Sequence, residues 1–266
     1  EYNLDRMIQG VQKSLGYYSK NFSPYQFKSL RIVEFPRYEK FAEPFPGMIA
    51  YSEGSGFIAK VDDKDPNAID NPFFLTASKV AHQWWLHQII AGDTKGATSL
   101  AYTLANYSAL MVMEETYGKE KIRILLQRNL ENYLSGRGKE REKESALAIN
   151  EYQNYVQSAK GGMAMYLLQD QIGADKVNLA LRNLIAQYAH KGAPYPSSQS
   201  LVDALRAVAS EDKQALITDL FEAIILFDNR AVKSEAKLLA NGEYEVTLDV
   251  AANKLKADEH GVEKEV

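Results

Sequence analysis

The chain has 266 residues, of which 45% are hydrophobic and 25% charged, a composition typical of a globular protein with a sizeable core. Its net charge of -4 is dispersed without a basic stripe, so nucleic acid is not an expected partner. The absence of cysteine excludes disulfides, thiolate zinc sites and a cysteine nucleophile. No apolar run approaches the roughly 20 residues of a membrane helix, so we expect no direct membrane insertion.

Residues 3–20 place apolar side chains at helical spacing, and the SLRIVEF segment after them predicts a buried strand. Two short apolar pieces, GMIAY and GFIAKV, predict strands at the edge of a sheet. The charged run SGRGKEREKES (135–145) predicts a solvated loop. Helices dominate from Thr76 onward, with the longest expected at 98–116 (stopped by Gly118), 119–134, 159–172 and 174–190.

The pattern changes after Arg230, where polar and apolar residues alternate in AVKSEAKLLA and GEYEVTLDVA. The Asn241-Gly242 pair between these runs predicts a β-hairpin. We therefore predict two domains, residues 1–228 and a partial β domain at 229–266. Because two strands cannot bury both of their faces, we expect the chain to be a segment of a longer protein.

The stretch TASKVAHQWWLHQ (76–88) resembles a zinc-peptidase helix. An H-E-x-x-H helix presents two imidazoles one turn apart to a metal, and its glutamate serves as general base. Here only the second histidine is present, as His82. A single histidine beside Trp84 and Trp85 is as a rule a hydrogen-bonded core residue, and these tryptophans are expected to be core aromatics.

Several stretches in matching order carry a wider resemblance: SLRIVEFPRYEKFA, AYSEGSGFI, VAHQWWLHQ, LANYSALMVMEETYGKEK, AKGGMAMYLL and ITDLFEAIILFDNR. Over nearly the whole chain they resemble the membrane alanyl aminopeptidase family of gluzincin zinc peptidases. The similarity is greatest to the aminopeptidase-like domains of bacterial proteins that also carry ABC-transporter permease segments. The resemblance implies an α+β fold, in which a thermolysin-like peptidase domain (a small mixed sheet plus a helical bundle) precedes a β-sandwich.

The resemblance also implies where the family's zinc ligands fall. The two histidine positions are Ser78 and His82. The third ligand, a glutamate in the family, falls on Tyr102, or on Ala101 if residues are counted strictly. A catalytic zinc site needs three protein ligands, so we expect neither a metal site nor a cofactor, although the family binds zinc.

Three further positions follow from the resemblance. The general-base glutamate falls on Lys79, and the tyrosine that stabilises the transition state falls on Ser158. Glu53 in AYSEG corresponds to a glutamate that binds a substrate's free amino terminus, so it is the candidate for substrate binding, with a role in an ion pair or a turn as the equal alternative. Because an ammonium is costly to bury unpaired, we expect Lys79 to pair with Glu53, directly or through water.

These substitutions indicate a catalytically degenerate aminopeptidase-like domain that acts as a binding or scaffolding module for a peptide or protein partner. By the same resemblance, the chain is expected to be a soluble, extracytoplasmic segment of a membrane-anchored bacterial protein. The alternative is an active zinc aminopeptidase with an atypical site. Metal analysis of the purified protein separates the two interpretations.

Overall fold

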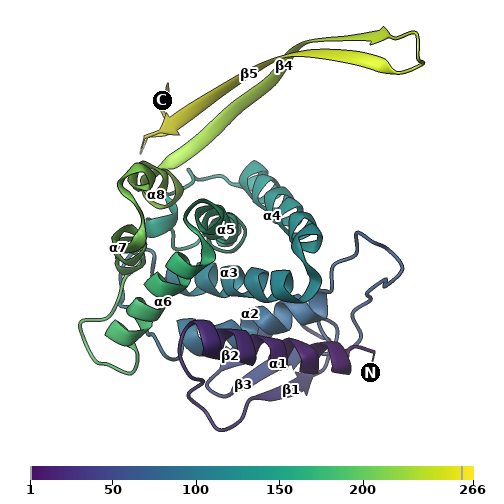
Figure 1. Ribbon diagram of the computed structural model, residues 1–266. Coiled ribbons are helices and arrows are strands. Elements are labelled where there is room, and N and C mark those ends of the chain that lie inside the picture. Colours follow the sequence, from purple (N-terminus) through teal and green to yellow (C-terminus); the bar gives the residue numbers. More distant parts are fainter. Residues whose placement is uncertain (1, 259) are drawn as a thin grey trace.

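A computed structural model describes residues 2–258 and 260–266 (Figure 1). The N-terminal part is a small mixed sheet, with strand order β1-β3-β2, covered by two helices that pack on each other. β3 runs parallel to β1 and antiparallel to β2. These elements are α1 (Leu4–Asn21), β1 (Arg31–Phe35), β2 (Ala42–Phe45), β3 (Met48–Ser52) and α2 (Asn71–Trp85).

The sheet corrects three sequence expectations. SLRIVEF contains β1, but every residue of β1 is exposed or half-exposed, so this strand is not buried. GMIAY forms the central strand, not an edge. GFIAKV (56–61) forms no strand, because its first residues continue the turns after β3, and the Asn3 side chain donates to the carbonyls of Gly56 (2.7 Å) and Ala59 (2.6 Å).

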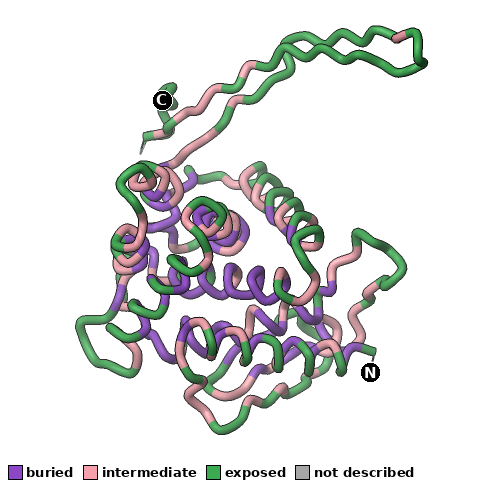
Figure 2. The backbone as a smooth tube through the Cα atoms, in the orientation of Figure 1, coloured by how far each residue is buried: buried purple, intermediate pink, exposed green. Residues whose placement is uncertain are grey.

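A helical bundle follows the sheet, with α3 at its centre (Figure 2). α3 packs on α2 and α5, and most of its residues are buried. None of the helices formed by residues 2–258 and 260–266 is long and apolar enough to span a bilayer. The bundle comprises α3 (Ala97–Tyr117), α4 (Lys119–Lys139), α5 (Gly161–Ile172), α6 (Ala174–Tyr188), α7 (Ser198–Val208) and α8 (Gln214–Ile217), with short turns η1 (Leu147–Ile149), η2 (Tyr155–Lys160), η3 (Glu211–Lys213) and η4 (Thr218–Glu222).

The predicted helices are confirmed, and Gly118 ends α3 with a positive φ of 82°. α4 runs beyond its expected end and takes up part of the charged run 135–145. The mixed α+β class is therefore as expected, with small sheets and many helices.

A long β-hairpin projects from the helical body (Figure 1). It consists of β4 (Ile224–Leu238) and β5 (Tyr244–Ala257), with the short β6 (Glu263–Glu265) beside β5. The turn at Asn241-Gly242 is confirmed, and Gly242 has the positive φ of 85° that favours glycine. Both faces of the outer hairpin are exposed (Figure 2). The division into two domains stays a prediction.

Two glycines let α5 approach α3 closely. A Cβ atom at Gly161 would meet Thr103, and one at Gly162 would meet Asn106, at less than contact distance. We predict that Gly162→Ala lowers the free energy of unfolding by about 1–3 kcal/mol, because added volume here forces the two helices apart. Gly16→Ala in α1 is the control, since nothing lies within 4 Å of its Cβ position.

The control should instead stabilise the protein by roughly 0.5–1 kcal/mol, the helix preference of alanine over glycine. Urea unfolding of both variants measures the difference. Equal effects of the two substitutions would show that the α3–α5 contact is loose.

Candidate functional site

The two tryptophans of α2 fix how this helix is rotated. The Trp84 indole N–H donates to the Ser23 carbonyl at 2.9 Å, and that of Trp85 donates to the Ser108 hydroxyl at 2.9 Å. Both rings are buried, as expected of core aromatics. At the start of α2, the Asp70 carboxylate accepts the amide of Phe73 at 3.0 Å and caps the helix.

Side-chain hydrogen bonds also attach α2 to β2. Gln83 donates to the Phe45 carbonyl (3.0 Å) and accepts from the Gly47 amide (2.9 Å). Lys79 lies one turn before Gln83, so the two side chains share the face of α2 that is directed at β2. Just after α2, the Nε2 atom of His87 lies 3.1 Å from the carbonyl of Pro44, the residue after Glu43.

His82 is a buried and neutral histidine. Its side chain is hydrogen-bonded, because Nδ1 lies 2.8 Å from the Ser78 carbonyl, which can only accept. Burial, helped by repulsion from Lys79, lowers the pKa of His82 to about 3. The Nε2 atom is buried and has no hydrogen-bond partner within the described part of the chain. The ring of Tyr102 packs edge-on against the imidazole, with centroids 5.5 Å apart.

Lys79 is half-buried, and burial lowers the pKa of its ammonium while the carboxylate of Glu43 opposes this effect. Among residues 2–258 and 260–266, no ion pair involves Lys79. A direct pair with Glu53 therefore does not form, and a pair through water stays a prediction. Glu53 follows the central strand, where its amide donates to the Phe35 carbonyl (2.9 Å), whereas Glu43 lies on β2, the strand attached to α2.

The two candidate positions for the family's third ligand lie differently in the structure. Tyr102 contacts the His82 ring, whereas Ala101 is buried with 5% of its surface exposed. Ser158 lies on η2, where its hydroxyl donates to the Asn154 side chain at 2.9 Å.

These residues do not fit a zinc ion. The region around His82 offers one imidazole with an ammonium one helical turn away, whereas a catalytic zinc needs three ligands. In the described part of the chain, no three His, Asp or Glu side chains are arranged to hold a metal ion.

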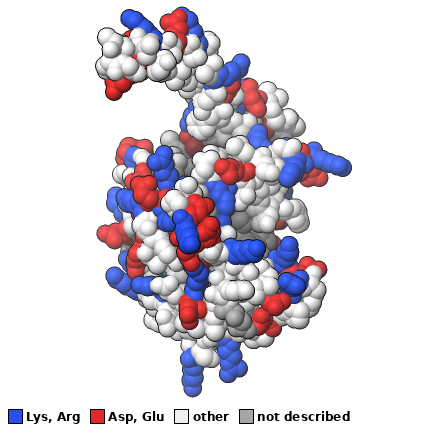
Figure 3. Space-filling model, turned by 90° about the vertical axis from the view of Figure 1, so that its right-hand side faces the viewer, with Lys and Arg blue, Asp and Glu red and all other residues white. Residues whose placement is uncertain are grey.

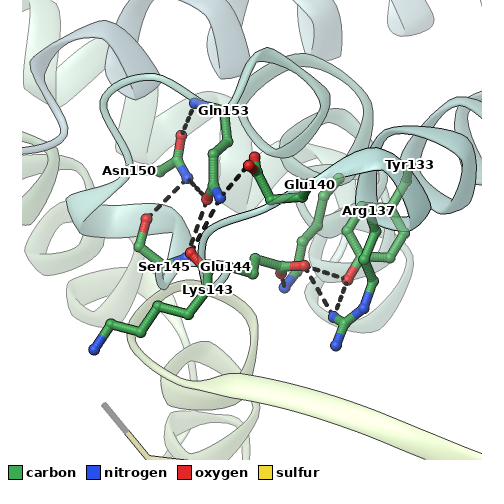
Figure 4. A network of polar contacts seen from close by, with 9 residues as sticks. Tyr133, Arg137, Glu140, Lys143, Glu144, Ser145, Asn150 and Gln153 are labelled. Carbon is green, nitrogen blue, oxygen red and sulfur yellow. Dashed lines mark hydrogen bonds and ion pairs between the residues drawn. The ribbon is translucent and has the colours of Figure 1, made fainter. Parts of the chain in front are cut away.

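A buried polar network that the sequence pattern does not predict joins α4, the loop after it and η2 (Figure 4). The carboxylate of Glu144 accepts from Tyr133 (2.7 Å) and Arg137 (3.0 Å) and also pairs with Lys160. Its side chain is 4% exposed, so the charged run 135–145 is not simply a solvated loop. Burial and the neighbouring carboxylate raise the pKa of Tyr133. The network forms because α4 and η2 pack against each other, and a local sequence pattern does not predict this contact.

The Asn150 and Gln153 side chains extend the network and hold the loop before η2. Asn150 donates to Gln153 (2.8 Å) and to Ser145 (2.9 Å), and Gln153 donates to Glu140 (3.1 Å) (Figure 4). The face drawn in Figure 3 shows charges of both signs interspersed over the helical body.

The fold is that of the peptidase domain of the M1 zinc metallopeptidases. The chain superposes on the M1 zinc metallopeptidase from Deinococcus radiodurans with a TM-score of 0.59 and 14% identity, covering 83% of this chain and 44% of that one. It superposes on yeast LTA4 hydrolase with a TM-score of 0.61 and 15% identity, covering 79% and 33%. The chain thus spans less than half of either protein. No family model and no curated protein matches the sequence.

We predict that His82 makes stability depend on pH. Its folded pKa of about 3 lies below the ordinary 6.5, so between these values the unfolded chain binds a proton that the folded chain does not. Stability should therefore fall as the pH drops from about 6.5 toward 3. His82→Leu removes this contribution and should flatten the dependence by up to about 1.4 kcal/mol per pH unit.

Urea unfolding of both proteins at several pH values measures the slopes. An NMR titration of the His82 ring supplies the direct check, since its resonances should not move above about pH 4. A midpoint near 6.5 would contradict the buried, neutral assignment.

Proposed function

We propose that this chain is a catalytically inactive, aminopeptidase-like domain that serves as a binding module. The observation that carries the proposal is the state of His82, a neutral imidazole whose neighbouring positions hold an ammonium and a tyrosine ring instead of further ligands. With neither a polarised water nor a general base, peptide hydrolysis has no mechanism at this position.

A role in a membrane-anchored, extracytoplasmic bacterial protein with ABC-transporter permease segments also belongs to this proposal. It is supported by the sequence resemblance alone.

We also propose that the hairpin of β4 and β5 is the start of a β-sandwich. Its outer half carries a row of exposed apolar side chains on one face: Tyr244, Val246, Leu248 and Val250.

We predict that the purified protein carries no stoichiometric zinc and does not cleave aminoacyl reporter substrates. Elemental analysis and a fluorogenic assay at matched protein concentration measure both properties. About one zinc per chain, together with activity that a chelator abolishes, would establish the active-enzyme alternative.

Introducing the family's zinc ligands and general base should restore zinc binding but not peptidase activity. We predict that Ser78→His, Lys79→Glu and Tyr102→Glu together produce zinc binding, because Tyr102 already contacts His82 and Ser78 lies one turn before it. The triple variant should remain a poor catalyst, since Ser158 supplies no phenol. Ser78→Ala, Lys79→Met and Tyr102→Phe together form the matched control, and zinc binding is measured by calorimetry. A folded triple variant without affinity for zinc would show that α2 and α3 do not meet in the required geometry.

A further inference from the structure

We propose that the outer face of the N-terminal sheet is a dimerisation surface, on which a second copy of this chain packs with the same face. The inference goes beyond the proposed function, because it concerns neither the region around His82 nor a ligand bound there. The observation that carries it is an exposed apolar face with one cation on β1 and one anion on β2, an arrangement that is complementary to itself.

The two faces of this sheet differ in what covers them. Successive residues of a strand point to opposite faces, so the strand register assigns each side chain to one face. Tyr51 of β3 and Pro44 of β2 are buried on the inner face, where the Tyr51 hydroxyl donates to the Pro72 carbonyl of α2 at 3.4 Å. The alternate positions form the outer face, whose apolar side chains are Val33, Phe35, Phe41, Phe45, Met48 and Ala50.

The outer face is open in the part of the chain that the structure describes. Val33, Phe41 and Phe45 are 46%, 47% and 44% exposed, which is high for apolar side chains that lie together on one surface. The hairpin of β4 and β5 projects from the opposite end of the molecule and does not reach this face (Figure 1). A contiguous exposed apolar patch of this kind marks a surface that another layer covers.

Two charged side chains of the strands lie on the same face. Arg31 begins β1 and Glu43 lies within β2, and both are exposed. Neither forms an ion pair within residues 2–258 and 260–266. Because β3 lies between β1 and β2, the cation and the anion stand at opposite edges of the face.

This placement of charges suits a two-fold symmetric dimer. A two-fold axis that runs along β3, between two stacked outer faces, lays β1 of one copy over β2 of its partner. Arg31 of each copy then faces the partner's Glu43, while the apolar side chains pack between sheets about 10 Å apart. An axis across the strands would lay β1 over β1 and bring the two arginines together, so the charges select the first arrangement.

The same charges favour a second copy over other occupants of the face. A bilayer would cover the apolar side chains but would leave Glu43 against lipid without a cation, which is costly. A second copy supplies both opposite charges by symmetry. Three short strands offer a small area, so we expect a weak and reversible dimer, at the low end of specific interfaces.

The test is light scattering of the full chain over a concentration series that reaches about 0.5 mM, within the range of weak association. We expect a monomer–dimer equilibrium. Arg31→Glu and Glu43→Arg should each weaken the homodimer roughly ten-fold or more, because like charges then face each other at two symmetric places. An equimolar mixture of the two variants should dimerise as well as the original chain, since every contact again joins opposite charges.

Lys176→Glu on α6 and Glu115→Arg on α3 are the matched controls, because both residues are exposed and the charge changes are the same. They should leave the equilibrium unchanged, and circular dichroism confirms that all variants fold. A monomer at every concentration would overturn the inference. A dimer that persists in both single variants would also overturn it, because association would then use another surface, such as the apolar row of the hairpin. A mixture that stays monomeric would reject the two-fold arrangement and the inference with it.

Discussion

The anchoring of α2 is the constraint on which the site depends. Two indole N–H groups and one glutamine tie this helix to the loop after α1, to α3 and to β2. These bonds are buried or half-buried, so breaking one leaves an unsatisfied polar group at a cost of about 1–3 kcal/mol. These bonds prevent α2 from rotating about its own axis. They thereby fix the directions in which the side chains of Ser78, Lys79 and His82 point.

The charges on α2 are compensated differently from those around Glu144. At Glu144 a buried carboxylate is surrounded by two cations and a phenol, so its charge is fully compensated. At α2 the imidazole is kept neutral and the ammonium lacks a contact partner among the residues described, so compensation is incomplete. Stability alone does not require such an arrangement, because an apolar side chain in place of Lys79 would avoid the desolvation cost.

Sequence reasoning succeeded where the signal is local. The helical spacing of α1, the stop at Gly118 and the Asn241-Gly242 turn each depend on residues near one another in the chain, and each is confirmed. The α+β class and the likeness to aminopeptidases were also predictable, since they rest on several ordered segments.

Other features depend on contacts between segments that are distant in the sequence, so no local pattern predicts them. The strand order β1-β3-β2 makes β2 the edge strand attached to α2, whereas Glu53 follows the central strand and makes no direct ion pair with Lys79. The hydrogen bonds from Asn3 to the carbonyls of Gly56 and Ala59 are also contacts between distant segments, since more than fifty residues separate the partners. The burial of Glu144 likewise arises from the meeting of α4 with η2.

We propose that α2 takes the place of a zinc-binding helix while its residues exclude the metal. Anomalous diffraction at the zinc absorption edge, from crystals grown with excess zinc, tests it most directly. The account predicts no anomalous peak within bonding distance of the His82 Nε2 atom, with the Tyr102 ring against the imidazole. A peak at about 2.0–2.1 Å from that nitrogen, the usual zinc–imidazole distance, would contradict it.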